Sequence, residues 1–201
     1  MAVMRRGFAR AVAVVLGSLA AATPALADGY VAPFIGGNFG GDSGSRLVGA
    51  TRDASPLTVG ITAGVMGGGI FGVEGDASFT PNFYGYGGPY RSSRLFTATA
   101  NLVAGVPIGG QGGPGLRPYA SAGLGLIRRQ IDAVLDVADS SEDSLGYSLG
   151  VGMMGFFSDH LGVRADLRYL RSLQRTDENS LGFEPGHFSY SRGSVGVVVR
   201  F

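Results

Sequence analysis

Residues 161–169 read LGVRADLRY, and apolar and polar positions alternate through the whole stretch. The apolar row consists of Leu161, Val163, Ala165, Leu167 and Tyr169, and the opposite row of Gly162, Arg164, Asp166 and Arg168. A repeat of two residues is that of a β-strand, because successive side chains point to opposite faces. The stretch therefore predicts a strand with one uncharged face and one charged face.

The same alternation recurs along the chain in stretches of about ten residues, bounded by Gly, Pro, Ser and Asp clusters. It predicts eight strands, near residues 29–39, 57–66, 70–80, 94–106, 116–128, 145–157, 161–171 and 190–201. These strands are long for a soluble protein, where about five or six residues are usual. The period and the high glycine content exclude a helical bundle.

The connections between these strands alternate in length. Short ones are predicted at 67–69, 107–115 and 158–160, and long ones at 40–56, 81–93, 129–144 and 172–189. Successive antiparallel strands would then have short turns at one end and long loops at the other. This asymmetry is typical of a bacterial outer-membrane barrel. We expect an all-β fold: an eight-stranded antiparallel up-and-down transmembrane β-barrel.

A secreted lipocalin-like barrel is the alternative, and the composition of the rows bears on it. The less apolar rows are mostly Gly, Ser and Thr, which suit the inside of a narrow barrel better than a solvated exterior. Aromatic residues near the predicted strand ends resemble the interfacial girdles of a membrane barrel. They are Phe71, Tyr119 and Phe157 near the short turns and Phe79, Phe96, Tyr147 and Tyr169 near the long loops, although Tyr119 falls on the less apolar face of its strand.

The first 27 residues have the pattern of a cleavable helical signal peptide, with a retained N-terminal anchor as the alternative. Arginines precede an apolar run at 11–22, and Ala25 and Ala27 supply the small residues of a cleavage site. We expect a barrel domain at 28–201. Its 13 Arg and 15 acidic residues give a net charge of −2, which argues against nucleic-acid binding. The chain has no Cys, which excludes disulfides and thiolate metal sites.

The charged residues of the polar rows are expected to meet inside the barrel. Strands three and seven of eight lie across the lumen, so Glu74 and Asp76 can reach Arg164 and Arg168. Asp166, Arg117 and Arg200 complete the predicted lumen charge network. Such charges form either an ion path or a salt-bridge plug, and the narrow interior of eight strands favours the plug.

These features together resemble the small outer-membrane barrels of the OmpA transmembrane domain, OmpX and OmpW group, with their porin-like relatives. The stretch GFFSDHLGVRADLRYLRSL (155–173) is similar to the sixth turn and seventh strand of that family. The resemblance implies location in the cell outer membrane, with both termini periplasmic. The final strand is similar to the signal read by the barrel-assembly machinery, through Val195, Val197, Val199 and Phe201.

The resemblance also implies a monomer in contact with outer-membrane lipid, including lipopolysaccharide, and extracellular ligands bound through the long loops. We expect a structural and surface-interaction role. A narrow OmpW-like pore or conduit for small or hydrophobic molecules is the alternative.

An enzyme is the remote alternative, because some barrels of this size are lipid A hydrolases with a His-x-Ser pair and a Glu. His187 and Ser189 supply the pair, but the acid that should follow is missing, and Glu184 precedes it. His160 is expected in a tight turn. Acidic residues at 132–143 could hold Ca²⁺, although their spacing fits no known Ca²⁺ loop. We expect no catalytic activity, no metal and no cofactor.

Overall fold

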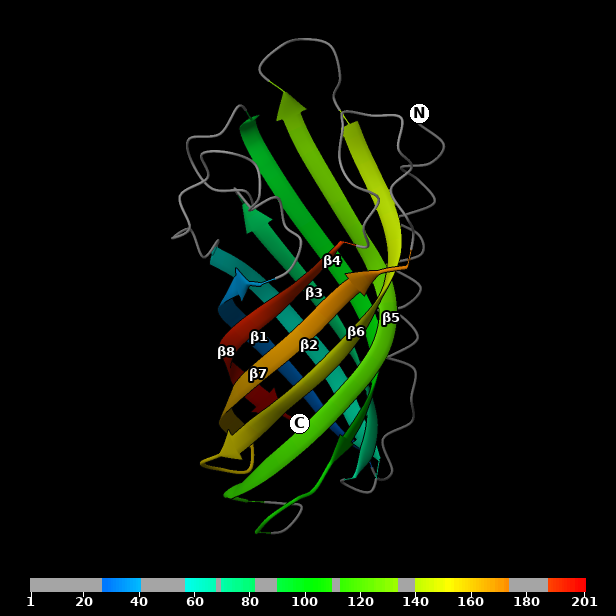
Figure 1. Cartoon of the computed structure of the whole chain (residues 1–201). Coiled ribbons are helices and arrows are strands. Elements are labelled where there is room, and N and C mark those ends of the chain that lie inside the picture. The colour runs from blue at the N-terminus through cyan, green and yellow to red at the C-terminus, as the bar shows by residue number, and fades with distance from the viewer. Residues whose placement is uncertain are drawn as a thin grey trace.

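A computed structural model describes residues 27–40, 57–67, 70–81, 90–109, 113–133, 140–173 and 188–201. They form a closed barrel in which each strand pairs antiparallel with its neighbours in the chain, and the last with the first (Figure 1). The strands are β1 (Ala27–Phe39), β2 (Leu57–Gly67), β3 (Phe71–Pro81), β4 (Tyr90–Gly105), β5 (Gly115–Ala133), β6 (Ser140–Phe156), β7 (Leu161–Ser172) and β8 (Ser189–Arg200). The predicted eight-stranded all-β architecture is confirmed. In these ranges no helix is long and apolar enough to span a membrane.

The barrel closes where β1 meets β8, next to the C-terminal residue. The amide N of Gly29 lies 3.1 Å from the carbonyl O of Phe201, and the amide N of Phe201 lies 2.9 Å from the carbonyl O of Gly29. A Cβ at position 29 would lie 2.7 Å from Cε2 of Phe201, so glycine leaves space for the terminal ring. Closure pairs the backbone of β1 and β8, which is what a lipid environment requires of a sheet.

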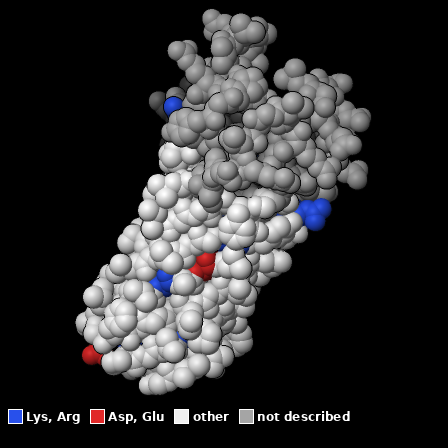
Figure 2. Space-filling model, turned by 60° about the vertical axis from the view of Figure 1, so that its left-hand side comes forward, with Lys and Arg blue, Asp and Glu red and all other residues white. Residues whose placement is uncertain are grey.

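The two rows of each strand separate as the alternation predicts. On β7, Val163 and Leu167 are 46% and 49% exposed on the outside, while Arg164 and Arg168 are buried inside. The outward rows of the other strands are likewise mostly apolar, and the wall in Figure 2 is largely white, with a few charged atoms visible between the outer side chains. An apolar exterior around a polar lumen is the arrangement of a transmembrane barrel.

Three strands run further than predicted, and this corrects two of the four predicted long loops. β4 begins at Tyr90, β5 continues to Ala133, and β6 begins at Ser140. The connection 134–139 is therefore shorter than the connection 106–114 at the opposite end of the barrel. The strand limits were predicted where the apolar rows end. Pairing continues beyond that level because polar side chains hold it, as in the ion pair between Arg128 and Asp143.

We name the two ends of the barrel by their connections. The turn end holds the connections 68–70, 106–114 and 157–160 together with the beginning of β1 and the end of β8. The loop end holds the other four connections. The turn at 106–114 contains an additional bridge between Ile108 and Leu116, so pairing extends one step into the predicted turn.

Six of the seven aromatic residues near the strand ends lie on outward rows, and Tyr119, on the less apolar row of its strand, does not belong to a girdle. Phe71 and Phe157, near the turn end, are 69% and 66% exposed. Tyr147 and Tyr169 pack together on the outer wall near the loop end, with ring centroids 6.3 Å apart. Tyr119 is 5% exposed and points into the lumen, because it belongs to the inward row of β5 with Arg117 and Ser121.

Side chains fill the described lumen in layers. An apolar layer near the turn end consists of Tyr30, Ala32, Met66, Val103, Tyr119, Met154, Phe156 and Val198. A second apolar layer near the loop end consists of Leu95, Ile127, Leu170, Phe188 and Tyr190. Charged and hydroxyl-bearing side chains such as Glu74, Asp76 and Ser78 lie between them, whereas Arg117 and Arg200 lie at the turn end beside Phe156.

Candidate functional site: the lumen ion-pair network

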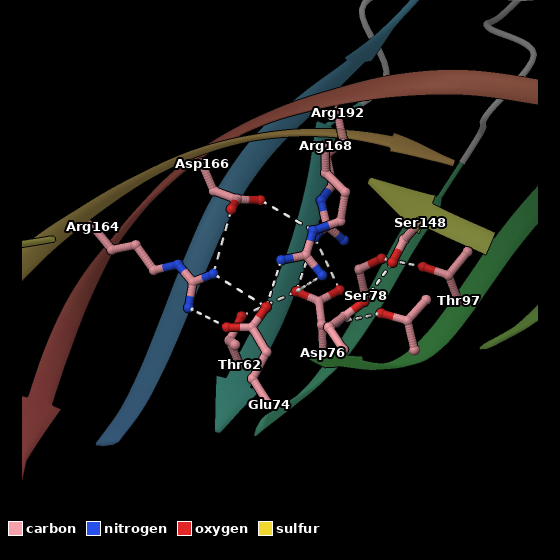
Figure 3. Close-up of polar contacts among 12 residues, drawn as sticks. Thr62, Glu74, Asp76, Ser78, Thr97, Ser148, Arg164, Asp166, Arg168 and Arg192 are labelled. Atoms are coloured by element: carbon pink, nitrogen blue, oxygen red, sulfur yellow. Dashed lines mark hydrogen bonds and ion pairs between the residues drawn. The ribbon is translucent and has the colours of Figure 1, made fainter. Parts of the chain in front are cut away.

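Glu74 on β3 joins two arginines that reach across the barrel from β7 (Figure 3). Arg164 Nη1 lies 3.0 Å from Glu74 Oε2, and Arg168 Nη2 lies 2.7 Å from Glu74 Oε1. All three side chains are at most 4% exposed. Glu74 therefore connects opposite walls of the barrel.

Asp76, two residues further along β3, forms the second connection. Arg192 Nη2 on β8 lies 2.9 Å from each oxygen of Asp76, and Arg168 Nη1 lies 3.9 Å from Oδ2. Thr62 Oγ1 donates to Oδ2 at 3.0 Å. Arg192 was not among the predicted lumen residues, although Tyr190, Arg192 and Arg200 lie at even positions of one strand and so share a face. That alternation places Arg192 on the same inward row as Arg200.

Asp166 on β7 completes the network, together with two tyrosines. It accepts hydrogen bonds from Arg168 Nε at 3.2 Å, Arg164 Nη2 at 3.3 Å and the hydroxyl of Tyr119 at 2.6 Å. The hydroxyl of Tyr30 donates to Glu74 Oε2 at 2.7 Å. Each hydroxyl uses a further lone pair of a carboxylate oxygen that also accepts a hydrogen bond from Arg164.

Glycines on neighbouring strands make room for both tyrosines. A Cβ at Gly64 would lie 2.9 Å from Cζ of Tyr30, and one at Gly152 would overlap the phenol of Tyr119. Both glycines belong to inward rows, so the crowding arises inside the lumen. Part of the glycine content of the chain thus serves to position the groups around the network.

We call Glu74, Asp76, Arg164, Asp166, Arg168 and Arg192 the lumen network. Three carboxylates face three guanidinium groups, so the network is neutral as a whole. Its six side chains are at most 4% exposed. Buried charges need such pairing, because a single unpaired one costs several kcal/mol. The described residues contain no group of His, Asp and Glu that could hold a metal ion.

Two predicted members, Arg117 and Arg200, face the lumen but lie in a separate layer at the turn end. Arg117 pairs with Asp28 at 3.3 Å, and Arg200 Nε donates to the carbonyl O of Asp159 at 2.8 Å. Both guanidinium groups lie over the ring of Phe156, at 6.0 and 4.4 Å from its centroid. The alternation predicted the face of these residues correctly, but it carries no information about their height along the barrel axis.

A hydroxyl-rich layer lies between the network and the loop end. Asn38 donates to Thr58 and Thr80, at 2.8 and 3.0 Å, and the two threonine hydroxyls lie 2.7 Å apart. On the other side of this layer, the hydroxyls of Ser78 and Thr97 lie 2.6 Å apart. Ser148 donates to the amide oxygen of Asn101. The polar rows of β1 to β4 and β6 therefore bond to one another.

The remaining predicted residues have these positions. Val195, Val197, Val199 and Phe201 form an exposed outward row on β8. His160 lies in the turn after β6, where its Nδ1 is 3.0 Å from the carbonyl O of Arg200. Ala27 is the first residue of β1 and Ser189 the first of β8. Ala25, Glu184, His187 and residues 134–139 of the acidic stretch lie outside the described residues.

A closed barrel of eight antiparallel strands, apolar outside and polar inside, defines an integral membrane protein of the outer-membrane type. Residues 11–201 match the model of one family, the outer membrane protein beta-barrel domain. The chain belongs to this family, and its place is the outer membrane. No curated protein matches the chain in sequence.

Solved structures of small outer-membrane barrels are similar to this one. Neisserial surface protein A has a TM-score of 0.60 and 19% identity, covering 87% of this chain and 99% of its own. OprG from Pseudomonas aeruginosa has a TM-score of 0.58 and 16% identity, covering 88% and 96%. Ail of Yersinia pestis, solved with the heparin analogue sucrose octasulfate, has a TM-score of 0.55 and 13% identity, covering 87% and 98%. At these identities the likeness concerns the fold alone.

Proposed function

We propose that this chain is a non-conducting outer-membrane barrel that acts through its loop end, outside the cell. The lumen network carries the proposal, because it links β3 to β7 and β8 through side chains with almost no exposure. Apolar layers lie on both sides of it. A conducting path through the barrel axis would need water in all of these layers.

In this proposal residues 1–27 are a signal peptide removed on export, and both barrel termini face the periplasm. The barrel-assembly machinery inserts the chain through its last strand, and the product is a monomer surrounded by outer-membrane lipid that includes lipopolysaccharide. Extracellular molecules are the expected ligands of the loops; Ail, with the same fold, was solved with a heparin analogue. We assign no catalytic reaction to the chain.

Single-channel recording in planar bilayers tests the closed lumen. We expect no conductance steps from the wild-type barrel, or from Glu74→Gln and Arg164→Gln. Insertion is checked separately by recovering the folded protein, whose gel mobility changes on heating. Clear steps whose size changes in Glu74→Gln or Arg164→Gln would show an ion path through the network and reject the proposal in favour of a narrow pore.

A further inference from the structure

The ladder that closes the barrel is interrupted in the middle of the wall. Between β1 and β8, pairing stops after Val31 and resumes at Phe34, so Pro33 is not paired with Val197. The register is the same on both sides of the gap, so no residue is inserted there. Among the described strands, the other seven ladders have no gap at the level of the apolar wall.

Proline explains the gap. In an antiparallel ladder every second residue pair exchanges two backbone hydrogen bonds, and Gly29 and Phe201 form such a pair. By that pattern the amide of residue 33 would donate to the carbonyl O of Val197, but proline has no N–H. The carbonyl O of Val197 therefore has no N–H opposite it in the ladder. In the hydrocarbon layer of a membrane, no water is available to replace that donor.

The position of this proline is unusual for a sheet, where prolines normally lie at strand ends or at edges. Pro81 is the last residue of β3, and Pro118 lies opposite Val106, which follows the end of β4. Pro33, in contrast, lies at the centre of β1. Of these three prolines, Pro33 alone removes a hydrogen bond from the middle of the wall.

An apolar groove of about 800 Å³ lies on the outer wall over the gap, and both Pro33 and Val197 line it. Ala165 of β7 forms a low point in this groove, because its two cross-strand neighbours, Met153 and Val195, have larger side chains. We call this feature the seam groove. It brings the carbonyl that lacks a donor together with an apolar surface that faces the lipid.

We propose that the seam groove binds a hydrocarbon chain that carries a hydroxyl group and is dissolved in the membrane. The apolar side chains would hold the chain, and its O–H would donate to the carbonyl O of Val197. Phe34 and Gly196 belong to inward rows but also line the groove, so the groove reaches the level of the backbone. A chain without a donor would leave the carbonyl unsatisfied, which is unfavourable.

A second copy of the barrel fits this groove less well than a hydroxylated chain. The apolar part of its wall consists of paired strands, whose backbone N–H groups are already used. It therefore offers no donor at the level of Val197. The inference is independent of whether the lumen conducts, because the seam groove lies on the outside of the barrel.

An NMR titration of the folded barrel in neutral detergent micelles tests this inference. The probes are dodecanol and dodecyl methyl ether, which share the alkyl chain and differ in the O–H donor. An isotope label on the valine carbonyls reports on Val197. We expect dodecanol to bind about tenfold more tightly than the ether and to shift the Val197 carbonyl signal. Equal affinities, or an unchanged Val197 signal, would overturn the inference.

Two proline variants separate the carbonyl from the rest of the wall. Pro33→Ala supplies the missing N–H, so the preference for dodecanol over its ether should disappear. Pro118→Ala is the matched control, because it restores an N–H outside the groove, and it should keep the preference. A preference that persists in Pro33→Ala would contradict the assigned role of the Val197 carbonyl.

Two alanine variants test the groove itself. Ala165→Leu should weaken the binding of both probes, because the larger side chain fills the low point of the groove. Ala122→Leu, on the outward row of β5 and outside the groove, should weaken neither. Equal effects of the two leucine substitutions would overturn the assignment of the site. So would displacement of dodecanol at high protein concentration, which would identify a second copy of the barrel as the occupant. If Pro33→Ala fails to fold, the two probes on the wild type and on Ala165→Leu still decide.

Discussion

Arg168 has no solvent exposure, and its guanidinium reaches all three carboxylates of the lumen network. It lies 2.7 Å from Glu74, 3.2 Å from Asp166 and 3.9 Å from Asp76. Each of the other five side chains of the network contacts only some of the network residues of opposite charge. Its removal would leave three carboxylates facing two guanidinium groups in a space that water scarcely reaches.

We therefore expect Arg168→Met to destabilise the barrel by about 3–5 kcal/mol, the usual cost of breaking a buried ion pair from one side. Urea unfolding in a neutral detergent without added lipid measures this. Arg171→Met, on the same strand but outside the network, is the control and should change the free energy of unfolding by less than about 1 kcal/mol. Similar effects of the two substitutions would show that the network contributes little to stability.

Gly152 tests the packing that positions the network. A Cβ at this position would overlap the phenol of Tyr119, whose hydroxyl donates to Asp166. We expect Gly152→Ala to cost about 1–3 kcal/mol through overpacking. Gly75→Ala is the control, because a Cβ there would have nothing within 4 Å. Tyr119→Ala should relieve part of the cost of Gly152→Ala, because the carbonyl O of Ala165, 2.5 Å from the added Cβ, stays in place. Equal costs at positions 75 and 152 would contradict this explanation.

At the scale of the strand, alternation predicts which way a side chain points but not where its strand stops. The row Leu161 to Tyr169 and its charged partner row follow from the sequence because a period of two assigns each residue to a face. The ends of β5 and β6 cannot be predicted from this alternation. The apolar residues stop at the end of the apolar wall, whereas the backbone ladder continues through polar pairs such as Arg128 and Asp143.

The stability of the ends of β5 and β6 beyond the apolar wall should depend on pH. Arg128, which forms a bidentate ion pair with Asp143, holds the pKa of the Asp143 carboxyl below its usual value. A lowered pKa in the folded state stabilises the hairpin above the unfolded-state pKa of about 3.9, and this contribution is lost as the pH falls through the folded-state pKa. Asp143 is 42% exposed, so the effect is local and at most about 1 kcal/mol.

Amide hydrogen exchange of residues 128–130 and 140–143 at pH 6 and pH 3 measures this local opening. We expect faster opening at pH 3 in the wild type, after correction for the intrinsic exchange rate. Asp143→Asn should show little difference in opening between the two pH values. A wild-type difference that persists in Asp143→Asn would assign the pH dependence to another group.

The last strand provides a further test, because Phe201 closes the ladder with Gly29. Deleting Phe201 removes two backbone hydrogen bonds and the ring that covers Gly29, and we expect a large fall in folded barrel in the outer membrane. The heat-modifiable gel band of outer-membrane fractions measures this. A conservative substitution in a loop is the control. Unchanged levels of the deletion variant would remove the role assigned to the terminal aromatic.

At the scale of the whole molecule, closing the sheet decides which inward residues meet. Glu74 and Arg164 are 90 residues apart in the chain and come together because β3 and β7 face each other across the lumen. Strand order alone predicts that encounter. It does not predict the separate layer of Arg117 and Arg200, since height along the axis depends on the ladder register. Arg192 could have been found by following the inward row of β8 back from Arg200 by four steps of two residues.

Because the lumen network is neutral as a whole, replacing all six residues together should affect the free energy of unfolding differently from replacing one of them. Replacing the whole set with neutral side chains of similar size, Gln or Asn for the acids and Met for the arginines, leaves no unpaired charge. Complete replacements of buried ion pairs are often neutral or stabilising, whereas removing one partner is not. We expect the sixfold variant to lose much less stability than the sum of six single substitutions.

The sixfold variant should also show no conductance in planar bilayers, because its side chains and the two apolar layers still fill the lumen. In this explanation the charges of the wild type do not close the lumen; each of them only needs an oppositely charged partner. Urea unfolding and conductance recording on the same preparation measure the two properties. An additive loss of stability would mean that the six residues act independently. Conductance in the sixfold variant would mean that the paired charges themselves exclude ions, and that packing alone is too loose to seal eight strands.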